Sequence, residues 1–252
     1  MRGAPRVHLE ETVLDQPGLD KSGRAIRDMF AGVAPRYDLL NHLLSGSLDV
    51  VWRRRAAEAL AAAPGDAVLD LCCGTGDQTA ALQKRGARVA AADFCVPMLA
   101  IAAPKLRRSP ARGAGRAGIL AADALALPFP AGRFAGATVS FGLRNVADLD
   151  AALRQLAAAL RPGAPLVVLE FAIPQARLLK AAYLFYFRRL LPAIGRLLSP
   201  RGSAYSYLPS SVLEFPQRRA FLDRMAAAGF AGLSWADLSG GIVCLYRGTR
   251  EP

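Results

Sequence analysis

The hydrophobic positions of the chain follow two alternating spacings, which predict strands and helices in alternation. Continuous apolar runs, typical of strands buried on both faces, occupy residues 67–71, 88–92, 118–122, 133–141 and 166–170. Helical spacing occupies the segment from the first run to Gly86 and residues 96–107 and 148–160. The last two runs, 233–238 and 242–247, meet at Ser239, Gly240 and Gly241 and predict a hairpin. The pattern indicates an α/β fold, in which a mostly parallel seven-stranded sheet has helices on both faces and a C-terminal antiparallel hairpin.

The residues before the first strand predict a separate helical segment. Apolar residues follow helical spacing from 25 to 63, with interruptions near Pro35 and Gly46, so we expect two or three helices. Residues 1–20 carry no apolar run, which predicts a loose tail and not a secretory signal. We therefore expect a tail at 1–20, helices that cover the active site at 21–64, and a ligand-binding domain at 65–252 with an aromatic helical insertion at about 172–216.

Composition and charge narrow the class of protein. The 252 residues are 53% hydrophobic and 21% charged, as in globular proteins, and the formal charge of +12 favours anionic partners. The 32 lysines and arginines are spread along the chain and not clustered, so we expect no nucleic-acid partner. Four cysteines without metal-type spacing predict no metal site and a reducing, cytoplasmic location.

A glycine-containing turn follows the first predicted strand, at a position where open parallel sheets bind ligands. Gly74 and Gly76 allow the backbone to approach a ligand closely, and Thr75 offers a hydroxyl group. A dinucleotide fingerprint requires a third glycine at position 79, but this chain has Thr79 there. The turn therefore predicts a ligand site without supporting NAD as the ligand.

Aspartates at the ends of the first three strands favour S-adenosyl-L-methionine as that ligand. Asp93 lies roughly 20 residues beyond the turn, where an acid accepts hydrogen bonds from both ribose hydroxyls of an adenosine. Asp70 could face the amino group of an aminoacyl chain, and Asp123, with the backbone of Ala124, could reach the adenine edge. Acids would repel a phosphate but suit a sulfonium and an amine. Each aspartate alone could instead be a helix cap or a turn former.

Longer segments carry a resemblance to a known family. The turn segment, Val68-Leu-Asp-Leu-Cys-Cys-Gly-Thr-Gly-Asp77, resembles class I methyltransferases. The most diagnostic segment, Ser140-Phe-Gly-Leu-Arg-Asn-Val146, is similar to the ubiquinone/menaquinone biosynthesis C-methyltransferases. Other segments extend this likeness over nearly everything after residue 25, including 37–41 with Ser45 and Trp52, 127–130, 160–163, 169–171, 205–208 and 240–243.

The resemblance implies a Rossmann-like class I methyltransferase that transfers a methyl group from S-adenosyl-L-methionine to a ring carbon of a prenylated quinol. The acceptor would be demethylmenaquinol or the methoxy benzoquinol precursor of ubiquinone. By family position, the cofactor contacts would be Thr75, Asp93, Asp123, Ala124 and Ser140, and the substrate contacts Tyr37, Asn41 and Tyr205. The chain departs from the family pattern at Leu40, Asp49, Ala164 and Ala172, where Met, His, Gly and Ser are usual. Asp49 is the largest departure, because it adds negative charge beside the expected substrate entrance.

A quinol carbon becomes nucleophilic when an adjacent ring hydroxyl loses its proton, so the enzyme must stabilise a ring oxyanion. We expect Arg144, just beyond the fourth strand, to provide the positive charge and Asn145 to orient the same oxygen. A water held by a carboxylate or by His42 could accept the proton. An Arg-Asn pair in this position could also be a surface or capping feature.

The insertion is rich in aromatic residues, which predicts a helix that covers a prenyl tail, although these residues could equally form core. Flanking arginines, including Arg177 and Arg189, suit an anionic lipid surface, so we expect peripheral contact with the inner face of the cell membrane. A homodimer is a further expectation. The alternative functions are methylation of another small or lipid acceptor, and noncatalytic binding of an adenosyl ligand or RNA.

Overall fold

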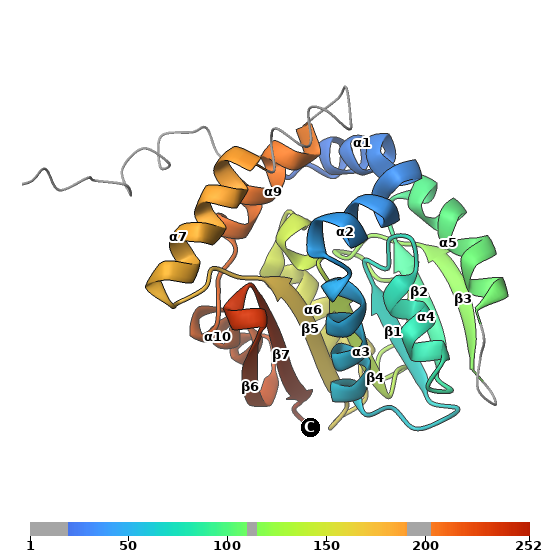
Figure 1. Ribbon diagram of the computed structural model, residues 1–252. Helices are drawn as coiled ribbons and strands as arrows, with labels where there is room; N and C mark the ends of the chain where they lie inside the picture. The colour runs from blue at the N-terminus through green and yellow to red at the C-terminus, as the bar shows by residue number, and fades with distance from the viewer. Residues whose placement is uncertain (1–19, 110–114, 191–202) are drawn as a thin grey trace, which may run out of the picture.

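A seven-stranded sheet forms the centre of the protein (Figure 1). The computed structural model describes residues 20–109, 115–190 and 203–252. The tail predicted at 1–20 thus lies outside the described residues, except for Asp20. The sheet has the order β3-β2-β1-β4-β5-β7-β6. Its strands are β1 (Ala67–Leu71), β2 (Arg88–Asp93), β3 (Arg116–Ala121), β4 (Gly136–Ser140), β5 (Pro165–Phe171), β6 (Phe230–Leu238) and β7 (Val243–Arg250).

The strand directions confirm the predicted fold class. β1 pairs in parallel with β2 and β4, and β7 pairs antiparallel with both β5 and β6. The order of the chain reverses between β1 and β4, because β2 and β3 extend the sheet to one side and β4 resumes it on the other. Ligands of open parallel sheets bind at such a reversal, beyond the carboxyl ends of the strands.

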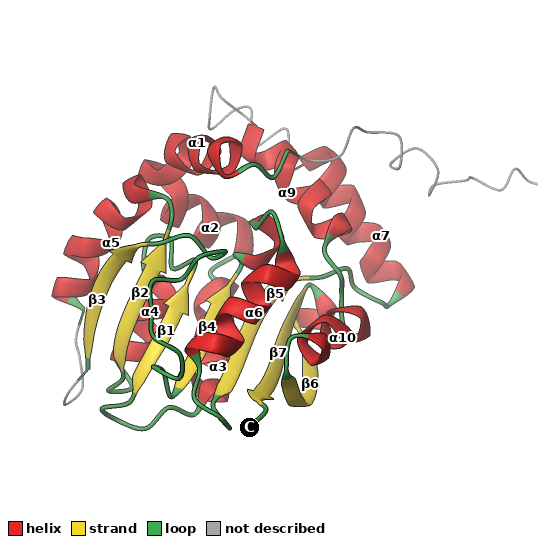
Figure 2. Ribbon diagram, turned by 180° about the vertical axis from the view of Figure 1, so that it is seen from behind, coloured by secondary structure: helices red, strands yellow, loops and turns green. Residues whose placement is uncertain are grey.

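Helices cover both faces of the sheet, as Figure 1 and the reverse view in Figure 2 show. On one face, α3 (Leu48–Leu60), α4 (Asp77–Gln83) and α5 (Val96–Arg108) bury residues such as Leu60, Leu82 and Leu106. On the other face, α6 (Leu149–Ala159) and α10 (Arg219–Ala227) bury Leu153 and Phe221. The apolar runs at β1, β4 and β5 are therefore buried as expected, whereas the run at β3, an edge strand, is largely exposed.

A layer of helices lies over the carboxyl ends of the strands (Figure 1). It consists of α1 (Gly23–Val33), the short 3-10 turn η1 (Ala34–Arg36), α2 (Tyr37–Ser45), α7 (Arg177–Phe185), the π-helical turn η3 (Tyr186–Leu190) and α9 (Ser203–Glu214). A small apolar cluster of Leu40, Leu44, Tyr186 and Leu208 joins α2 to the later segment. We call the part formed by α1, η1 and α2 the N-terminal cap.

The predicted and observed elements differ at the third and fourth strands and at one late helix. The fourth strand is shorter than the predicted 133–141: Phe134 makes an isolated bridge to Leu160, and Phe141 has a positive φ of 62° that ends the strand. The third strand begins two residues earlier than predicted, at Arg116. Helix α10 was not predicted at all.

Two glycines allow close packing at the edge where the strands end. A Cβ atom on Gly142 would lie 2.3 Å from the Cβ atom of Cys72, so the segment after β4 can pass the turn after β1 only because this residue is glycine. Gly76 has a φ of 87°, and its Cβ atom would lie 3.2 Å from Leu106 of α5. Both positions bring the backbone segments around the strand reversal together.

Candidate active site

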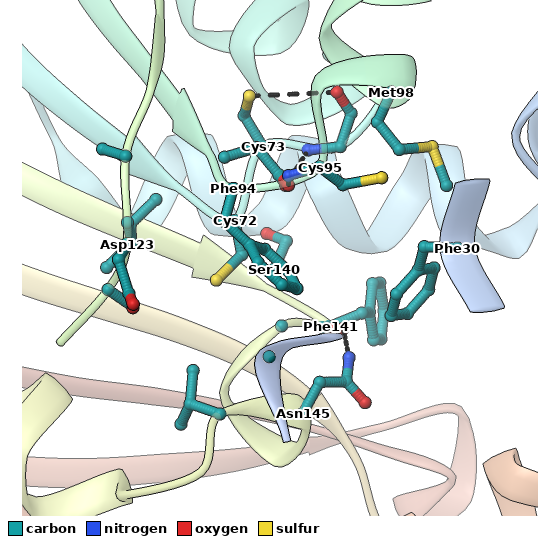
Figure 3. Close-up of a pocket in the computed structure, with 18 of the residues that line it drawn as sticks. Phe30, Cys72, Cys73, Phe94, Cys95, Met98, Asp123, Ser140, Phe141 and Asn145 are labelled. Carbon is teal, nitrogen blue, oxygen red and sulfur yellow. Dashed lines mark hydrogen bonds between the residues drawn. The ribbon is translucent and has the colours of Figure 1, made fainter. Parts of the chain in front are cut away.

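A cavity of about 140 Å³ lies beside the glycine turn, at the strand reversal. We call it the turn cavity. Its lining comes from the turn after β1 and from the segments that follow β2, β3 and β4, and the N-terminal cap adds Phe30 and Tyr37. Figure 3 places Asp123 at one side of the cavity and Phe30 with Phe141 at the other. The turn cavity includes Gly74, Thr75, Asp93, Asp123, Ala124, Ser140 and Asn145 of the predicted site.

Asp93 anchors the glycine turn to the second strand. Its Oδ2 atom accepts a hydrogen bond of 2.8 Å from the Gly74 N–H, and its Oδ1 atom accepts one of 2.8 Å from the Cys95 N–H. Burial raises the pKa of the Asp93 carboxyl, although these backbone N–H groups counteract the shift. Each oxygen keeps lone-pair capacity for a further donor, so the carboxylate can still accept hydroxyl groups of a ligand.

Asp70 and Gly76 were also predicted to contact the cofactor, but they are not among the residues that line the turn cavity. Asp70 is fully buried, and its two oxygens accept hydrogen bonds from the hydroxyls of Thr79 at 2.5 Å and Thr138 at 3.0 Å. Burial raises the pKa of Asp70 to about 6. Thr79, which breaks the dinucleotide fingerprint, therefore supports Asp70 beneath the turn, and Gly76 serves packing against α5.

Two of the predicted site residues that line the cavity carry a polar atom with no hydrogen-bond partner among the described residues. These atoms are Ser140 Oγ and Asn145 Oδ1, and both are buried. Asp123 accepts a hydrogen bond of 2.9 Å from the Leu125 N–H, next to the buried Ala124. A buried polar atom without a hydrogen-bond partner lowers the stability of a folded protein, so these two atoms are suited to bind a polar ligand.

The N-terminal cap is joined to the turn by charged and polar contacts that we call the cap network. Thr75 Oγ1 donates a hydrogen bond of 2.5 Å to Asp38 of α2. Lys105 Nζ of α5 lies 2.5 Å from the Asp38 carboxylate and 2.7 Å from that of Asp77. In the sequence, Asp38 is visible only as part of the segment 37–41, because its partners lie far away in the chain.

A second cavity, of about 320 Å³, lies under the helical layer. We call it the aromatic cavity, because its lining includes Phe141, Phe171, Tyr183, Tyr186, Phe187 and Tyr207. The predicted substrate residues Tyr37 and Asn41 line it, and the side chain of Tyr205 lies outside the described residues. Phe30, Tyr37, Arg53 and Phe141 line both cavities, so the two meet at these four residues.

Arg144 lines the aromatic cavity and is paired with a buried acid. Its Nη1 atom lies 3.0 Å from Glu170 Oε2, its backbone N–H donates to Glu170 Oε1 at 3.2 Å, and Nη1 also donates to the Phe141 carbonyl. Burial raises the pKa of Glu170, and the Arg144 charge counteracts this shift. The positive charge predicted for catalysis is thus already balanced within the chain, but Arg144 Nε is buried without a partner and remains an available donor.

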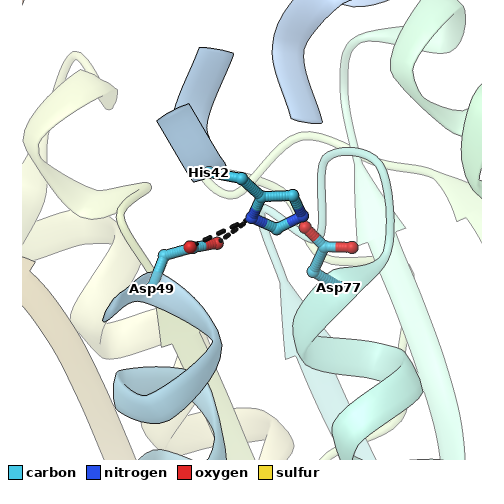
Figure 4. A group of neighbouring side chains, drawn as sticks. All are labelled: His42, Asp49 and Asp77. Atoms are coloured by element: carbon cyan, nitrogen blue, oxygen red, sulfur yellow. Dashed lines mark hydrogen bonds and ion pairs between the residues drawn. The ribbon is translucent and has the colours of Figure 1, made fainter. Parts of the chain in front are cut away.

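His42 and Asp49 form a pair at the edge of the aromatic cavity (Figure 4). The Nδ1 atom of His42 lies 2.9 Å and 3.0 Å from the two Asp49 oxygens, and Ser45 donates a hydrogen bond of 2.9 Å to Asp49. The other side of the imidazole faces Asp77. Asp49 is buried and lines the aromatic cavity, whereas His42 does not. The unusual Asp49 is therefore held in place by local partners.

One functional candidate, Arg53, was missed from the sequence, and two others, Tyr183 and Tyr207, were expected only as aromatic residues of the insertion. Tyr183 and Tyr207 line the aromatic cavity with buried hydroxyl groups that have no partner among the described residues, and burial raises the pKa of Tyr207 to about 12. Arg53 lines both cavities. In the sequence Arg53 is the first of three consecutive arginines, a run typical of a solvated helix face. Only its place on the buried face of the helix distinguishes it from Arg54 and Arg55.

The sheet order and the cavity at its reversal define a class I methyltransferase fold, and solved structures agree. The [4+2]-cyclase SpnF matches with a TM-score of 0.66 and 17% identity, over 90% of this chain and 95% of that chain. A Thermotoga maritima methyltransferase described as S-adenosylmethionine-dependent matches with a TM-score of 0.63 and 17% identity, over 90% and 100%. At this identity the likeness shows the fold alone.

The family model for the ubiE/COQ5 methyltransferase family matches residues 19–250, and the chain belongs to that family. It is therefore an S-adenosylmethionine-dependent methyltransferase. Among its relatives, the demethylmenaquinone methyltransferase of Thermus thermophilus is 48% identical, over 88% of this chain and all of that protein. The Mycolicibacterium paratuberculosis protein of the same name is 45% identical, over 93% and 97%. A Geobacter sulfurreducens ubiquinone/menaquinone biosynthesis C-methyltransferase is 42% identical, over 92% and 91%.

Proposed function

We propose that this protein methylates a ring carbon of demethylmenaquinol to form menaquinol. The observation that carries the proposal is the aromatic cavity, which meets the turn cavity at four shared residues. An aromatic acceptor in one cavity is thus next to a methyl donor in the other. Relatives named demethylmenaquinone methyltransferase at 45% and 48% identity support this choice of ring. The methoxy benzoquinol precursor of ubiquinone is the second candidate, because the Geobacter relative's name includes ubiquinone biosynthesis.

The residues of the turn cavity fit S-adenosyl-L-methionine. The free lone pairs of Asp93 suit ribose hydroxyls, Asp123 and Ala124 suit the adenine edge, and Ser140 Oγ and Asn145 Oδ1 await polar partners. When bound, the cofactor supplies an electrophilic methyl group on a positively charged sulfur. The contribution of the chain is to hold the two reactants together and to exclude water.

The walls of the aromatic cavity can hold the ring and the start of a prenyl tail. Trp52, Phe141 and Phe171 form one cluster, with ring centroids between 4.6 and 6.4 Å apart. Tyr183 and Phe187 stack at 4.2 Å from the side of the insertion. Aromatic surfaces of this kind bind flat, apolar ligands and keep water away from a ring oxyanion.

Arg144 and Asn145 act on a ring oxygen in this proposal. Because Glu170 neutralises Arg144, the guanidinium contributes a fixed hydrogen-bond donor, Nε, and little net charge. A preorganised donor of this kind stabilises an oxygen on which negative charge develops. Asn145 lines the adjoining turn cavity, where its Nδ2 atom donates to the Phe141 carbonyl at 3.5 Å.

Asp49 is the proton acceptor that the geometry favours. Among the described residues, Asp49 carries the one carboxylate that lines the aromatic cavity. His42 and Ser45 fix the orientation of this carboxylate. A positioned carboxylate next to a ring hydroxyl can take its proton directly or through one water. His42 does not line the aromatic cavity, so its role in this proposal is to orient Asp49.

The experiment that tests the proposal is turnover by the purified protein with S-adenosyl-L-methionine and a panel of reduced acceptors. We expect demethylmenaquinol to gain one methyl group, detected by mass spectrometry, and the oxidised quinone to give no product. Methylation of the benzoquinol alone would favour the second candidate. No product from either quinol, with turnover of another acceptor, would refute both.

We also propose that the protein contacts an anionic membrane surface at the cytoplasmic face. Along α7, Leu178 is 86% exposed and Phe185 is 61% exposed, and the two lie seven residues apart on one face of the helix. The neighbouring Arg177, Lys180 and Arg189 are exposed. This combination suits an interfacial helix, and the quinol acceptor is membrane-bound. None of the helices in the described ranges is long and apolar enough to cross a bilayer. A homodimer remains a prediction.

A further inference from the structure

Arg53 of α3 is a buried cation with an unusual lack of partners. Its side chain is only 8% exposed, and its Nε atom is buried without a hydrogen bond. No carboxylate among the described residues lies within ion-pair distance of it. The interaction that holds it is with the face of Phe141, whose ring centroid lies 5.3 Å from the guanidinium carbon. An aromatic face attracts a cation only modestly compared with a carboxylate.

The acidic neighbour best placed to pair with Arg53 is engaged elsewhere. Asp49 precedes Arg53 by four residues on the same helix, a spacing at which opposite charges usually meet. Asp49 instead contacts His42 and Ser45. The buried Asp70 is near enough to interact electrostatically with Arg53, but its two oxygens accept hydrogen bonds from Thr79 and Thr138 and it makes no ion pair with Arg53. A buried guanidinium without a directly paired carboxylate is costly, so it is suited to an anion that comes from outside the chain.

The other cations of the two cavities differ from Arg53 in this respect. Lys21, which lines the turn cavity, lies 3.2 Å from Glu214. Arg144, which lines the aromatic cavity, lies 3.0 Å from Glu170. Within the described part of the chain, Arg53 is thus the cavity-lining arginine or lysine that has no acidic partner, and it lies where the cavities meet.

We propose that Arg53 binds the α-carboxylate of S-adenosyl-L-methionine. The carboxylate is the one anionic group of this cofactor, and Asp93 and Asp123 would repel it. Phe141, on which Arg53 stacks, lies on the side of the turn cavity away from Asp123 (Figure 3). A nucleoside held at Asp93 and Asp123 would direct its aminoacyl end towards that side. A guanidinium pairs with a carboxylate through two parallel hydrogen bonds, which gives orientation as well as affinity.

The inference rests on S-adenosyl-L-methionine as the cofactor, and binding measurements test it separately from turnover. Calorimetry would compare S-adenosylhomocysteine with its decarboxylated analogue, which keeps the nucleoside, the thioether and the amine. We expect Arg53→Gln to weaken binding of S-adenosylhomocysteine at least about tenfold. Binding of the decarboxylated analogue should change little. Arg53→Lys should recover part of the loss.

Arg54→Gln is the matched control, because Arg54 follows on the same helix, is exposed and lies near Glu58. This control should bind both ligands like the unaltered protein. Equal losses for both ligands in Arg53→Gln would indicate a structural role and overturn the inference. Unchanged binding of both, with slower turnover, would place Arg53 on the acceptor's oxyanion and also overturn it.

The unaltered protein provides a test that needs no variant. It should prefer S-adenosylhomocysteine over the decarboxylated analogue by at least about tenfold. Absence of that preference overturns the role of Arg53 alone. Failure to bind either ligand would instead refute the cofactor assignment on which the proposed function depends.

Discussion

Buried polar atoms in this site are of two kinds, those with a partner in the chain and those without one. Arg144 and Asp49 are both buried, but each has a partner in the chain, Glu170 and His42 respectively. Ser140 Oγ, Asn145 Oδ1 and Arg53 Nε have none among the described residues. The paired groups stabilise the shape of the cavities, and the unpaired atoms mark where polar parts of the reactants belong.

The pairing of Arg144 with Glu170 predicts a pH-dependent stability in the variant Arg144→Met. Removing the cation raises the pKa of the buried Glu170 further, so the folded variant keeps a proton that the unfolded chain has lost. Stability should therefore be highest in acid and fall as the pH rises. We expect a loss of about 3–5 kcal/mol at pH 8 and a smaller loss at pH 5, measured by urea unfolding.

The double variant Arg144→Met with Glu170→Gln serves as the control, since it has no carboxyl group to titrate at this position. It should lose the additional pH dependence. An Arg144→Met variant that is destabilised equally at both pH values would show that the ion pair does not set its stability.

The position of Asp49 predicts the kinetic effect of Asp49→Asn. Loss of a proton acceptor should lower kcat by about 10²–10⁴-fold, because the amide cannot take the hydroxyl proton. Binding of S-adenosylhomocysteine should stay unchanged, since Asp49 does not line the turn cavity. The measurement is steady-state turnover with demethylmenaquinol, paired with calorimetry. A kcat within a few-fold of the unaltered protein would exclude Asp49 as the acceptor.

Among the elements, the strands could be predicted most closely from the sequence, since burial on both faces leaves a continuous apolar run. β1 occupies the predicted 67–71, and β2 and β5 differ by a residue or so at their ends. The cavity-lining acids could be predicted as well, because Asp93 is the last residue of β2 and Asp123 lies two residues beyond the end of β3. The contacts between distant residues that support the site could not be predicted from the sequence. Asp38 and Lys105 are 67 positions apart, and Arg53 and Phe141 belong to different elements that only the fold brings together.

The N-terminal cap is the element that we expect to move when the cofactor binds. The turn cavity measures about 140 Å³, whereas ligand pockets usually span about 300–1,000 Å³. Phe30 and Tyr37 of the cap line the cavity, and the cap network holds α2 to the turn by partly exposed contacts. Such contacts contribute only about 0–1 kcal/mol each, so they can open without unfolding the sheet.

Hydrogen exchange read by mass spectrometry tests this expectation. Asp38→Asn removes the carboxylate that holds Thr75 and Lys105, so amides of residues 23–45 should exchange faster than in the unaltered protein. S-adenosylhomocysteine should slow their exchange in both proteins. Faster exchange throughout the sheet would point to general destabilisation, and an unchanged rate in 23–45 would show that the cap network does not hold the cap.

The protein as a unit combines a site for a water-soluble donor with one for a membrane-bound acceptor. Residues of the cap line both cavities, and Leu179 and Tyr183 of α7 also line the aromatic cavity. Figure 1 shows the cap and α7 in the layer over the same end of the sheet, and α7 carries the exposed apolar and cationic residues. A surface that meets the membrane there would bring the acceptor to the aromatic cavity without extracting it far into water.

Flotation with anionic vesicles tests the membrane contact. The unaltered protein should float with vesicles that contain anionic lipid, and less at high salt. The double variant Leu178→Ser with Phe185→Ser should float several-fold less. Leu120→Ser is the control, because Leu120 is also exposed but lies on β3 at the opposite edge of the sheet. Equal flotation of all three proteins would exclude α7 as the contact.

The central claim, methylation of a quinol ring, is tested most directly by mass spectrometry of the quinones in cells that lack this protein. We predict that demethylmenaquinone, one methyl group lighter than menaquinone, accumulates, and that the gene for the unaltered protein restores menaquinone. An unchanged quinone pool would contradict the claim.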